Sequence, residues 1–313
     1  MLNSTATAPA PSTGLSAAAE MTEVQTVSGK SEARLPRQVW VTAAVLGVLL
    51  IALYYRVAIK LVSDWWNIPD YSHGLLIPFF VLYMVWDKRN SFLATPVKPS
   101  WGGIWLVVPA ILILLVGVFG ADLFLSRISF VILMAGIILL LLGKGMLRES
   151  VFLLFVCMLA IPLPVLVMNH VTFPLQLKAS ELASGLLSLV GVPVLREGNV
   201  IQLPAMQLEV AEACSGIRSL MSLFTVAIIY GYFLEKGIAR RTVLALASIP
   251  IAVAANALRI FGTGLCVQYW DPDKAVGFFH EFSGWLVFLV SLSLLYLVHV
   301  AMRVFWKKRE VVA

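Results

Sequence analysis

The feature of this sequence that most limits its fold is a series of eight apolar stretches separated by short polar segments. A helix needs ~20 largely apolar residues to cross a bilayer. Hydrophobic residues make up 60% of the chain and charged residues 13%, outside the range of soluble globular proteins. We therefore predict an all-α, polytopic membrane protein. The predicted spans are approximately residues 39–55, 75–86, 103–121, 128–142, 151–168, 219–234, 243–258 and 285–302.

The two ends of the chain differ from these stretches. Residues 1–36 are rich in Ala, Ser, Thr, Pro and Glu without apolar periodicity, which is typical of a disordered tail. That polar leader is too long for a signal peptide, so the first span is expected to remain as an uncleaved anchor. We predict a tail (1–36), an eight-span membrane domain (37–304) and a basic C-terminal tail (305–313). Prolines inside spans, such as Pro162 and Pro164, are expected to kink their helices.

The distribution of basic residues predicts the orientation in the membrane. With eight spans, both termini lie on one side, and that side carries most of the 23 lysines and arginines. The positive-inside rule then places both termini in the cytoplasm. The ends of the spans that carry Arg218 and Arg259 would then face the opposite, outer side of the membrane. Since topology accounts for the net charge of +6, nucleic acid is not an expected partner.

The longest outer segment, residues 169–215, is predicted to carry two elements. Residues 174–190 have apolar side chains at helical spacing and form either an interfacial helix or a ninth, short membrane element. Residues 194–203 read as two strands around a Gly-Asn turn, followed by an alternating run at 206–210. A small extracytoplasmic β element is therefore expected before the sixth span. It would either cap the helices or contribute to a substrate groove.

Cys214 lies four residues before Arg218, at the start of an apolar span. On a helix, residues four apart share one face. A nearby cation and the positive end of a helix both favour the thiolate, which is the nucleophilic form. The alternative is a small packing residue beside an arginine that reaches the interface. The other cysteines, Cys157 and Cys266, are read as packing thiols, and their spacing gives no disulfide framework or zinc site.

Polar residues at the outer ends of other spans form further candidates. Asn256 lies one turn before Arg259, and ionisable groups in membrane spans indicate a function or a specific partner. Three histidines, His73, His170 and His280, fall on the same predicted side as Cys214. Topology alone does not choose among them. No two-histidine ligand spacing is present, so neither a metal nor another cofactor is expected.

Taken together, these pieces resemble the exosortase family of polytopic cysteine transpeptidases or proteases. The resemblance covers most of the chain from about residue 40 to residue 302, and the cysteine motif is its most specific part. The matching pieces are Tyr71-Ser72-His73-Gly74, Ile161-Pro162-Leu163-Pro164, Glu212-Ala213-Cys214-Ser215-Gly216-Ile217-Arg218-Ser219, Asn256-Ala257-Leu258-Arg259-Ile260, and His280 with Gly284.

The resemblance implies a role for each of these residues. Cys214 would be the nucleophile, Arg259 the catalytic arginine and His280 the acid and base. His73 is the reserve candidate for the base. Supporting or substrate-binding positions are Arg218, Asn256, Tyr71, His73 and Glu212.

The resemblance also implies a substrate. Family members are similar in acting on exported proteins that end in a sorting signal of the PEP-CTERM type: a Pro-Glu-Pro-type motif, a transmembrane helix and a basic tail. Cleavage at the outer face through a thioester would end in hydrolysis or in transfer to a cell-envelope amine. The alternative is a transporter or channel in which Arg218, Asn256 and Arg259 line a polar path. Zincin and serine-elbow signatures are missing from the polar span ends, which argues against other membrane proteases.

Overall fold

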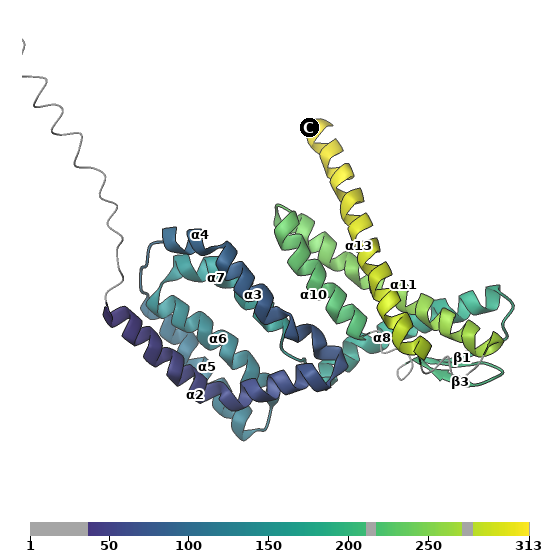
Figure 1. The fold of residues 1–313 in the computed structure, drawn as a ribbon, viewed down its shortest axis with the longest axis horizontal. Coiled ribbons are helices and arrows are strands. Elements are labelled where there is room, and N and C mark those ends of the chain that lie inside the picture. The colour runs from purple at the N-terminus through teal and green to yellow at the C-terminus, as the bar shows by residue number, and fades with distance from the viewer. Residues whose placement is uncertain (1–36, 211–216, 271–277, 313) are drawn as a thin grey trace, which may run out of the picture. The chain divides into compact units, whose positions relative to one another are not determined.

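The computed structural model describes residues 37–210, 217–270 and 278–312, and most of them are helical (Figure 1). The chain divides into two compact units, residues 1–53 and 54–313. The described elements, in chain order, are α2 (Arg37–Asn67), the 3-10 helix η1 (Pro69–Leu75), α3 (Ile77–Asp87), α4 (Arg89–Ala94), the 3-10 helix η2 (Trp101–Gly103), α5 (Ile104–Phe119), α6 (Leu123–Leu141), α7 (Lys144–Leu159), α8 (Val165–Leu189), β1 (Leu195–Glu197), β2 (Val200–Gln202), β3 (Gln207–Glu209), α10 (Ile217–Leu234), α11 (Ile238–Tyr269) and α13 (Phe278–Val312).

Within the described residues, five helices are long and apolar enough to cross a membrane. The protein is therefore a mostly helical, multi-pass membrane protein, but the predicted number of eight spans is not confirmed. The helix α3 has 11 residues, about 17 Å at 1.5 Å per residue, and the apolar helix Arg218–Leu234 is also short of the required length. The five candidate spans are Ala44–Asn67, Trp101–Phe119, Leu123–Leu141, Ile238–Tyr269 and Phe282–Trp306.

One predicted span is wrong in its bounds. Residues 151–168 do not form one helix, because α7 ends at Leu159 and α8 begins only at Val165. Pro162 and Pro164 have no amide hydrogen to donate, and each disfavours helical geometry in the residue before it. The chain therefore breaks at this point and starts a new helix. The predicted element at 174–190 is the second part of α8.

Three other helices extend beyond their predicted ends. The helix α2 continues to Asn67, well past residue 55, and α13 runs from Phe278 to Val312, so the predicted C-terminal tail is helical through Val312. The helix α11 continues for ten residues beyond Arg259. The predicted ends were set by the nearest charged residues. A helix can run past a charged residue, because its backbone hydrogen bonds do not depend on the hydropathy of the side chains. Arg259 therefore lies inside a helix and not at its end.

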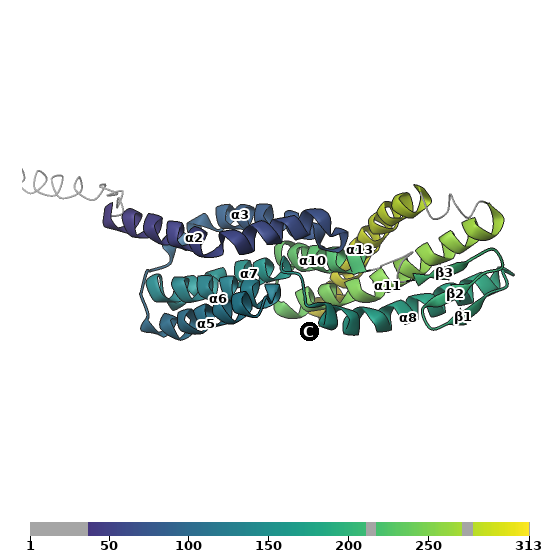
Figure 2. The same cartoon turned by 90° about the horizontal axis from the view of Figure 1, so that it is seen from below.

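The predicted β element is confirmed as a three-stranded antiparallel sheet of order β1-β2-β3. Gly198, in the turn between β1 and β2, has a φ of 66°, which glycine adopts without the cost that a side chain brings. One face of the sheet buries Ile201 and Leu208 against α8 and α11, where Leu187 and Ile260 join the same core. Figures 1 and 2 both show the sheet beside these two helices. The sheet is thus a cap on the helices.

The helices of the larger unit pack through small contact residues and apolar clusters. A Cβ atom at Gly103 would lie 2.5 Å from the Leu140 nitrogen, so glycine lets η2 approach the end of α6. Small residues serve the same purpose in other membrane helix pairs. A separate core joins α10, α11 and α13 through Leu223, Leu244 and Leu295. The second core fixes the three helices that surround the candidate site.

Candidate active site

The structure describes part of the predicted site. Cys214 and Glu212 lie outside the described residues, and for His280 only the backbone, within α13, is described. Their predicted roles are therefore neither confirmed nor contradicted. The remaining candidates come from three elements: Tyr71 and His73 from η1, Arg218 from α10, and Asn256 and Arg259 from α11.

The Arg259 side chain extends from α11 to the first turns of α13. Its Nε donates a long hydrogen bond of 3.4 Å to Ser283 Oγ. A Cβ atom at Gly284 would lie 3.4 Å from Arg259 Nη2 and 3.5 Å from Cζ, which is ordinary contact distance, so the guanidinium lies against the backbone of α13 at Gly284. Residues 280, 283 and 284 share one face of a helix by their spacing. Arg259 is therefore held against the turn of α13 that carries His280.

Asn256 lies one turn before Arg259 on α11 and is buried, with 6% of its surface exposed. It lines a small cavity of about 20 Å³ together with Thr172 and Gln176 of α8 and Leu220 of α10. That volume is enough for about one water molecule. Asn256 thus lies among three helices, close to the first turn of α10.

Arg218, in the first turn of α10, lies beside η1. Its Nε is 3.9 Å from Asp70 Oδ1, and 56% of the arginine side chain is exposed. An ion pair this exposed contributes little to stability. The contact does show that the Arg218 and Asp70 side chains lie near each other. The sequence analysis missed Asp70, although this carboxylate directly precedes the Tyr71 motif.

The Tyr71–Gly74 motif lies beside the residues that directly precede the Ile161–Pro164 motif. Trp65 Nε1 donates a 2.8 Å hydrogen bond to the Ala160 carbonyl oxygen, at the break between α7 and α8. A Cβ atom at Gly74 would lie 2.3 Å from the same Nε1, so only glycine fits there. His73 Nε2 is 3.3 Å from the Leu159 carbonyl oxygen. The Tyr71–Gly74 turn therefore closes over the free carbonyl groups at the end of α7.

Comparison with protein families gives one match. The model of the transmembrane exosortase family matches residues 65–297. The chain belongs to the transmembrane exosortase family. The matched region begins at Trp65 and includes η1, the α7–α8 break, Arg218, Arg259 and position 280. Neither the comparison with curated proteins nor that with solved structures gives a match.

Membership of the exosortase family establishes the general function. The protein is a multi-pass membrane protein of exosortase type, and its substrates in general are exported proteins that carry a sorting signal. Family members are membrane cysteine transpeptidases or proteases. Among the residues that the structure describes, no three His, Cys, Asp or Glu side chains lie close enough to hold a metal ion.

An open pocket of about 220 Å³ in this exosortase lies between η1, α3 and α10. Ser72 and His73 line one side, Ser222 and Thr225 line the other, and Phe288 of α13 is among the apolar walls. Ser222 follows Arg218 by four residues, about one helical turn. The pocket therefore offers hydroxyl groups and an imidazole within an apolar wall, next to the helix start that follows Cys214 in sequence.

Tyr71 and His73 are both held in their neutral forms by burial. The pKa of Tyr71 is raised mainly by burial, and the nearby Asp70 carboxylate raises it further. Burial lowers the pKa of His73, and the Leu159 and Asp70 carbonyl groups only partly oppose this effect. Neutral His73 donates from Nε2 to Leu159, and its Nδ1 is buried without a hydrogen-bond partner among the described residues. These two side chains thus carry no charge near neutral pH.

Acidification should loosen the η1 turn. In the unfolded turn His73 takes up a proton near pH 6.5, whereas in the folded turn it does so only at lower pH. The turn is therefore fully stable above pH 6.5 and loses stability as the pH falls through the folded pKa. We expect amide hydrogen exchange in residues 69–76, corrected for the intrinsic rate, to be faster near pH 5 than near pH 7.5. In His73→Gln this pH dependence should disappear, and its persistence would contradict the prediction.

A second polar cluster lies at the other end of α10. His299, of α13, is buried, accepts from Tyr230 OH at 2.6 Å through Nδ1 and donates to Glu235 Oε1 at 2.7 Å through Nε2. Tyr230 is twelve residues from Arg218 on the same helix, about 18 Å at 1.5 Å per residue. His299 therefore belongs to a buried network that joins α10 to α13, well away from the candidate site.

Proposed function

We propose that this family member is a thiol transpeptidase or protease that cleaves the C-terminal sorting signal of exported proteins. Cys214 is the nucleophile, Arg259 the electrostatic catalyst and His280 the acid and base. The observation that carries the proposal is the position of the Arg259 guanidinium against Ser283 and Gly284, one turn after His280. Two of the three proposed groups thereby come from adjoining turns of α11 and α13.

The proposed reaction begins at a backbone carbonyl of the sorting signal. The Cys214 thiolate attacks the carbonyl carbon, and the electron pair moves to the oxygen of a tetrahedral intermediate. When the C–N bond breaks, a thioester remains on Cys214 and His280 protonates the leaving amine. His280 then takes a proton from water or from an acceptor amine, which attacks the thioester and releases the thiolate. Hydrolysis and transfer share every step up to the thioester.

Arg259 fits an electrostatic role and not that of a base. A guanidinium remains protonated in proteins, so it donates hydrogen bonds but cannot remove a proton. A fixed cation at the developing oxyanion stabilises the transition state without first having to reorganise. Ser283 and the backbone at Gly284 hold the Arg259 guanidinium in place, which supports this role.

The remaining candidates are proposed to bind substrate. Arg218 is half exposed and lies near Asp70, which suits a contact with a polar part of the sorting signal. The pocket of Ser72, His73, Ser222 and Thr225 would take an apolar side chain of the signal and hold its backbone through the hydroxyl groups. Asn256 supports the adjoining helices, and Tyr71 fixes the turn. Glu212 is assigned to substrate binding next to Cys214.

The proposed location is the bacterial cytoplasmic membrane, with both termini in the cytoplasm and the site at the outer face. The positive-inside rule supports this orientation. A substrate anchored by its own helix would then cross beside the enzyme and present its motif at the outer surface, where an exported protein can be released or joined to a cell-envelope amine. The basic tail of such a signal would remain in the cytoplasm.

Co-expression tests the proposal. The chain is produced with a tagged exported protein that ends in a Pro-Glu-Pro-type motif, a transmembrane helix and a basic tail. We expect the tagged protein to lose its anchor, seen as a shorter band that leaves the membrane fraction, only when the chain is present. A matched substrate with a scrambled motif should stay intact. Equal processing of both substrates, or processing without the chain, would refute the proposal.

A further inference from the structure

A second, larger pocket lies away from the candidate active site. It has a volume of about 400 Å³ and is lined by the second part of α2, by α3, α6 and α7. The residues Val57, Leu61, Val81 and Phe130 are typical of its walls, which are almost entirely apolar. Two of these helices, α2 and α6, are candidate membrane spans. The pocket therefore lies between helices of which two are long and apolar enough to cross a membrane, where hydrocarbon is the solvent.

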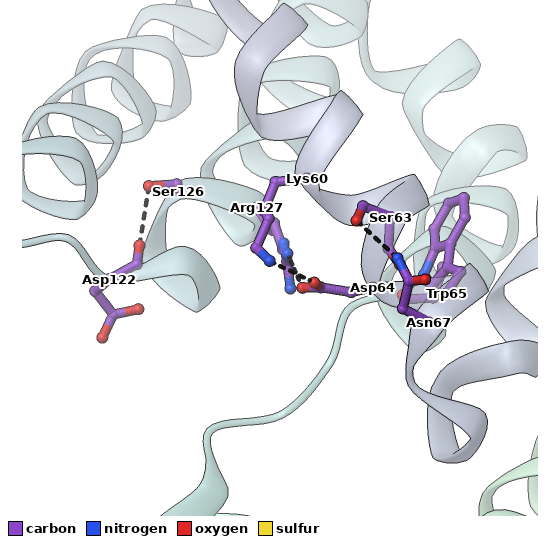
Figure 3. Close-up of polar contacts among 9 residues, drawn as sticks. Lys60, Ser63, Asp64, Trp65, Asn67, Asp122, Ser126 and Arg127 are labelled. Atoms are coloured by element: carbon purple, nitrogen blue, oxygen red, sulfur yellow. Dashed lines mark hydrogen bonds and ion pairs between the residues drawn. The ribbon is translucent and has the colours of Figure 1, made fainter.

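One wall of this pocket is formed by a buried arginine. Arg127 directly precedes the predicted span 128–142, but it lies in the first turns of α6 and is only 3% exposed. Its Nη2 contacts the Asp64 carboxylate of α2, which Lys60 approaches at 3.1 Å (Figure 3). The Arg127 Nε–H is buried and has no hydrogen-bond partner among the described residues.

The unsatisfied group and the charges point to a ligand. A buried donor without an acceptor costs about 1–3 kcal/mol, so an acceptor oxygen that reached Arg127 Nε from the pocket would be stabilised there. Lys60 and Arg127 share a single carboxylate, Asp64, which leaves one net positive charge in the group. We propose that the pocket binds one acyl chain of an anionic glycerophospholipid, with an ester or phosphate oxygen at Arg127 and the head group near Lys60. This proposal does not depend on the catalytic mechanism.

The charge beside the pocket favours an anionic lipid as the occupant. Lys60 and Arg127 outnumber the single Asp64 carboxylate, and the rest of the pocket lining is almost entirely apolar. Basic pockets between membrane helices also bind anionic lipid head groups in other proteins.

Photo-crosslinking tests the lipid site directly. The full-length protein is placed in phosphatidylcholine nanodiscs with a trace of phosphatidylglycerol that carries a diazirine in its acyl chain, irradiated, and mapped by peptide mass spectrometry. We expect labels on the pocket residues of α3 and α6. Phosphatidylglycerol should label them about fivefold more than a matched phosphatidylcholine probe, the effect of about one basic residue near an anionic head group. Lys60→Gln should remove this preference.

Two variants on α2 provide the matched pair. Ala58 lines the pocket, and Ala58→Trp should fill it and abolish the labelling. Ala52, on the same helix and outside the pocket lining, is exposed, and Ala52→Trp should leave the labelling unchanged. The proposal is overturned if both head groups label equally, if Ala58→Trp labels like Ala52→Trp, or if a sorting-signal helix displaces the probe. The last result would assign the pocket to the substrate.

Discussion

Replacement of Cys214 by alanine should abolish removal of the substrate anchor. No other described or predicted group replaces the sulfur as the atom that forms the thioester, and loss of a nucleophile in a comparable hydrolase lowers the rate about 10⁶-fold. In the co-expression experiment the tagged substrate should therefore remain full length and in the membrane. A thiol-directed alkylating reagent added from outside the cell should inhibit the unsubstituted protein to the same extent.

The two other cysteines provide the controls. Cys157, in α7, lines the proposed lipid pocket, and Cys266, in α11, packs against the core beneath the sheet. Both are free, half-buried thiols. Alanine at either position should leave anchor removal intact, since a small packing thiol is replaced by a side chain of similar size. Anchor removal by Cys214→Ala would contradict the assignment of Cys214 as the nucleophile. The transporter alternative, in which Arg218, Asn256 and Arg259 line a polar path, instead predicts no anchor removal even by the unsubstituted protein.

The sequence predicts most of the helices because their signal is local. Long uncharged stretches identify helices that approach membrane length, and the Gly198-Asn199 turn between short apolar runs identifies the hairpin of the sheet. The error at residues 151–168 has a different origin. Hydropathy averages over composition, whereas Pro162 and Pro164 act on backbone geometry and separate α7 from α8. Proline pairs inside an apolar stretch should therefore be read as possible helix breaks.

The contacts between distant parts of the chain were not predictable from sequence spacing. Asp64 and Arg127 are 63 residues apart in the chain, and each alone looks like a loop charge near a membrane surface. Arg259 and Gly284 each belong to a motif that resembles the exosortase family, but a motif gives no distance between them. Only the packing of α11 on α13 brings the Arg259 guanidinium against Gly284, one turn after His280.

Loss of the Arg259 charge should have the second largest effect on the reaction. We expect Arg259→Ala to lower the rate of anchor removal about 10²–10³-fold, the usual cost of removing a group that stabilises the oxyanion. Arg259→Lys retains the charge but not the planar set of donors, so it should recover only part of the rate. The rate is measured as single-turnover thioester formation on a purified sorting-signal peptide, which separates chemistry from binding.

The position of the guanidinium can be tested without changing Arg259 itself. A leucine at Gly284 would occupy the space in which Nη2 and Cζ of Arg259 lie, so Gly284→Leu should move the guanidinium and reduce thioester formation nearly as much as Arg259→Ala. Gly185, in α8, has no atom within 4 Å of an added Cβ, so Gly185→Leu is the matched glycine control and should react normally.

The unfolding temperature separates a structural role of Arg259 from an electrostatic one. If Arg259 served only to join α11 to α13, the Arg259 variant with the larger loss of rate would also show the larger loss of unfolding temperature. An electrostatic role instead predicts that Arg259→Lys and Arg259→Ala unfold at similar temperatures and differ in rate, because the charge acts on the transition state and not on the packing of the two helices.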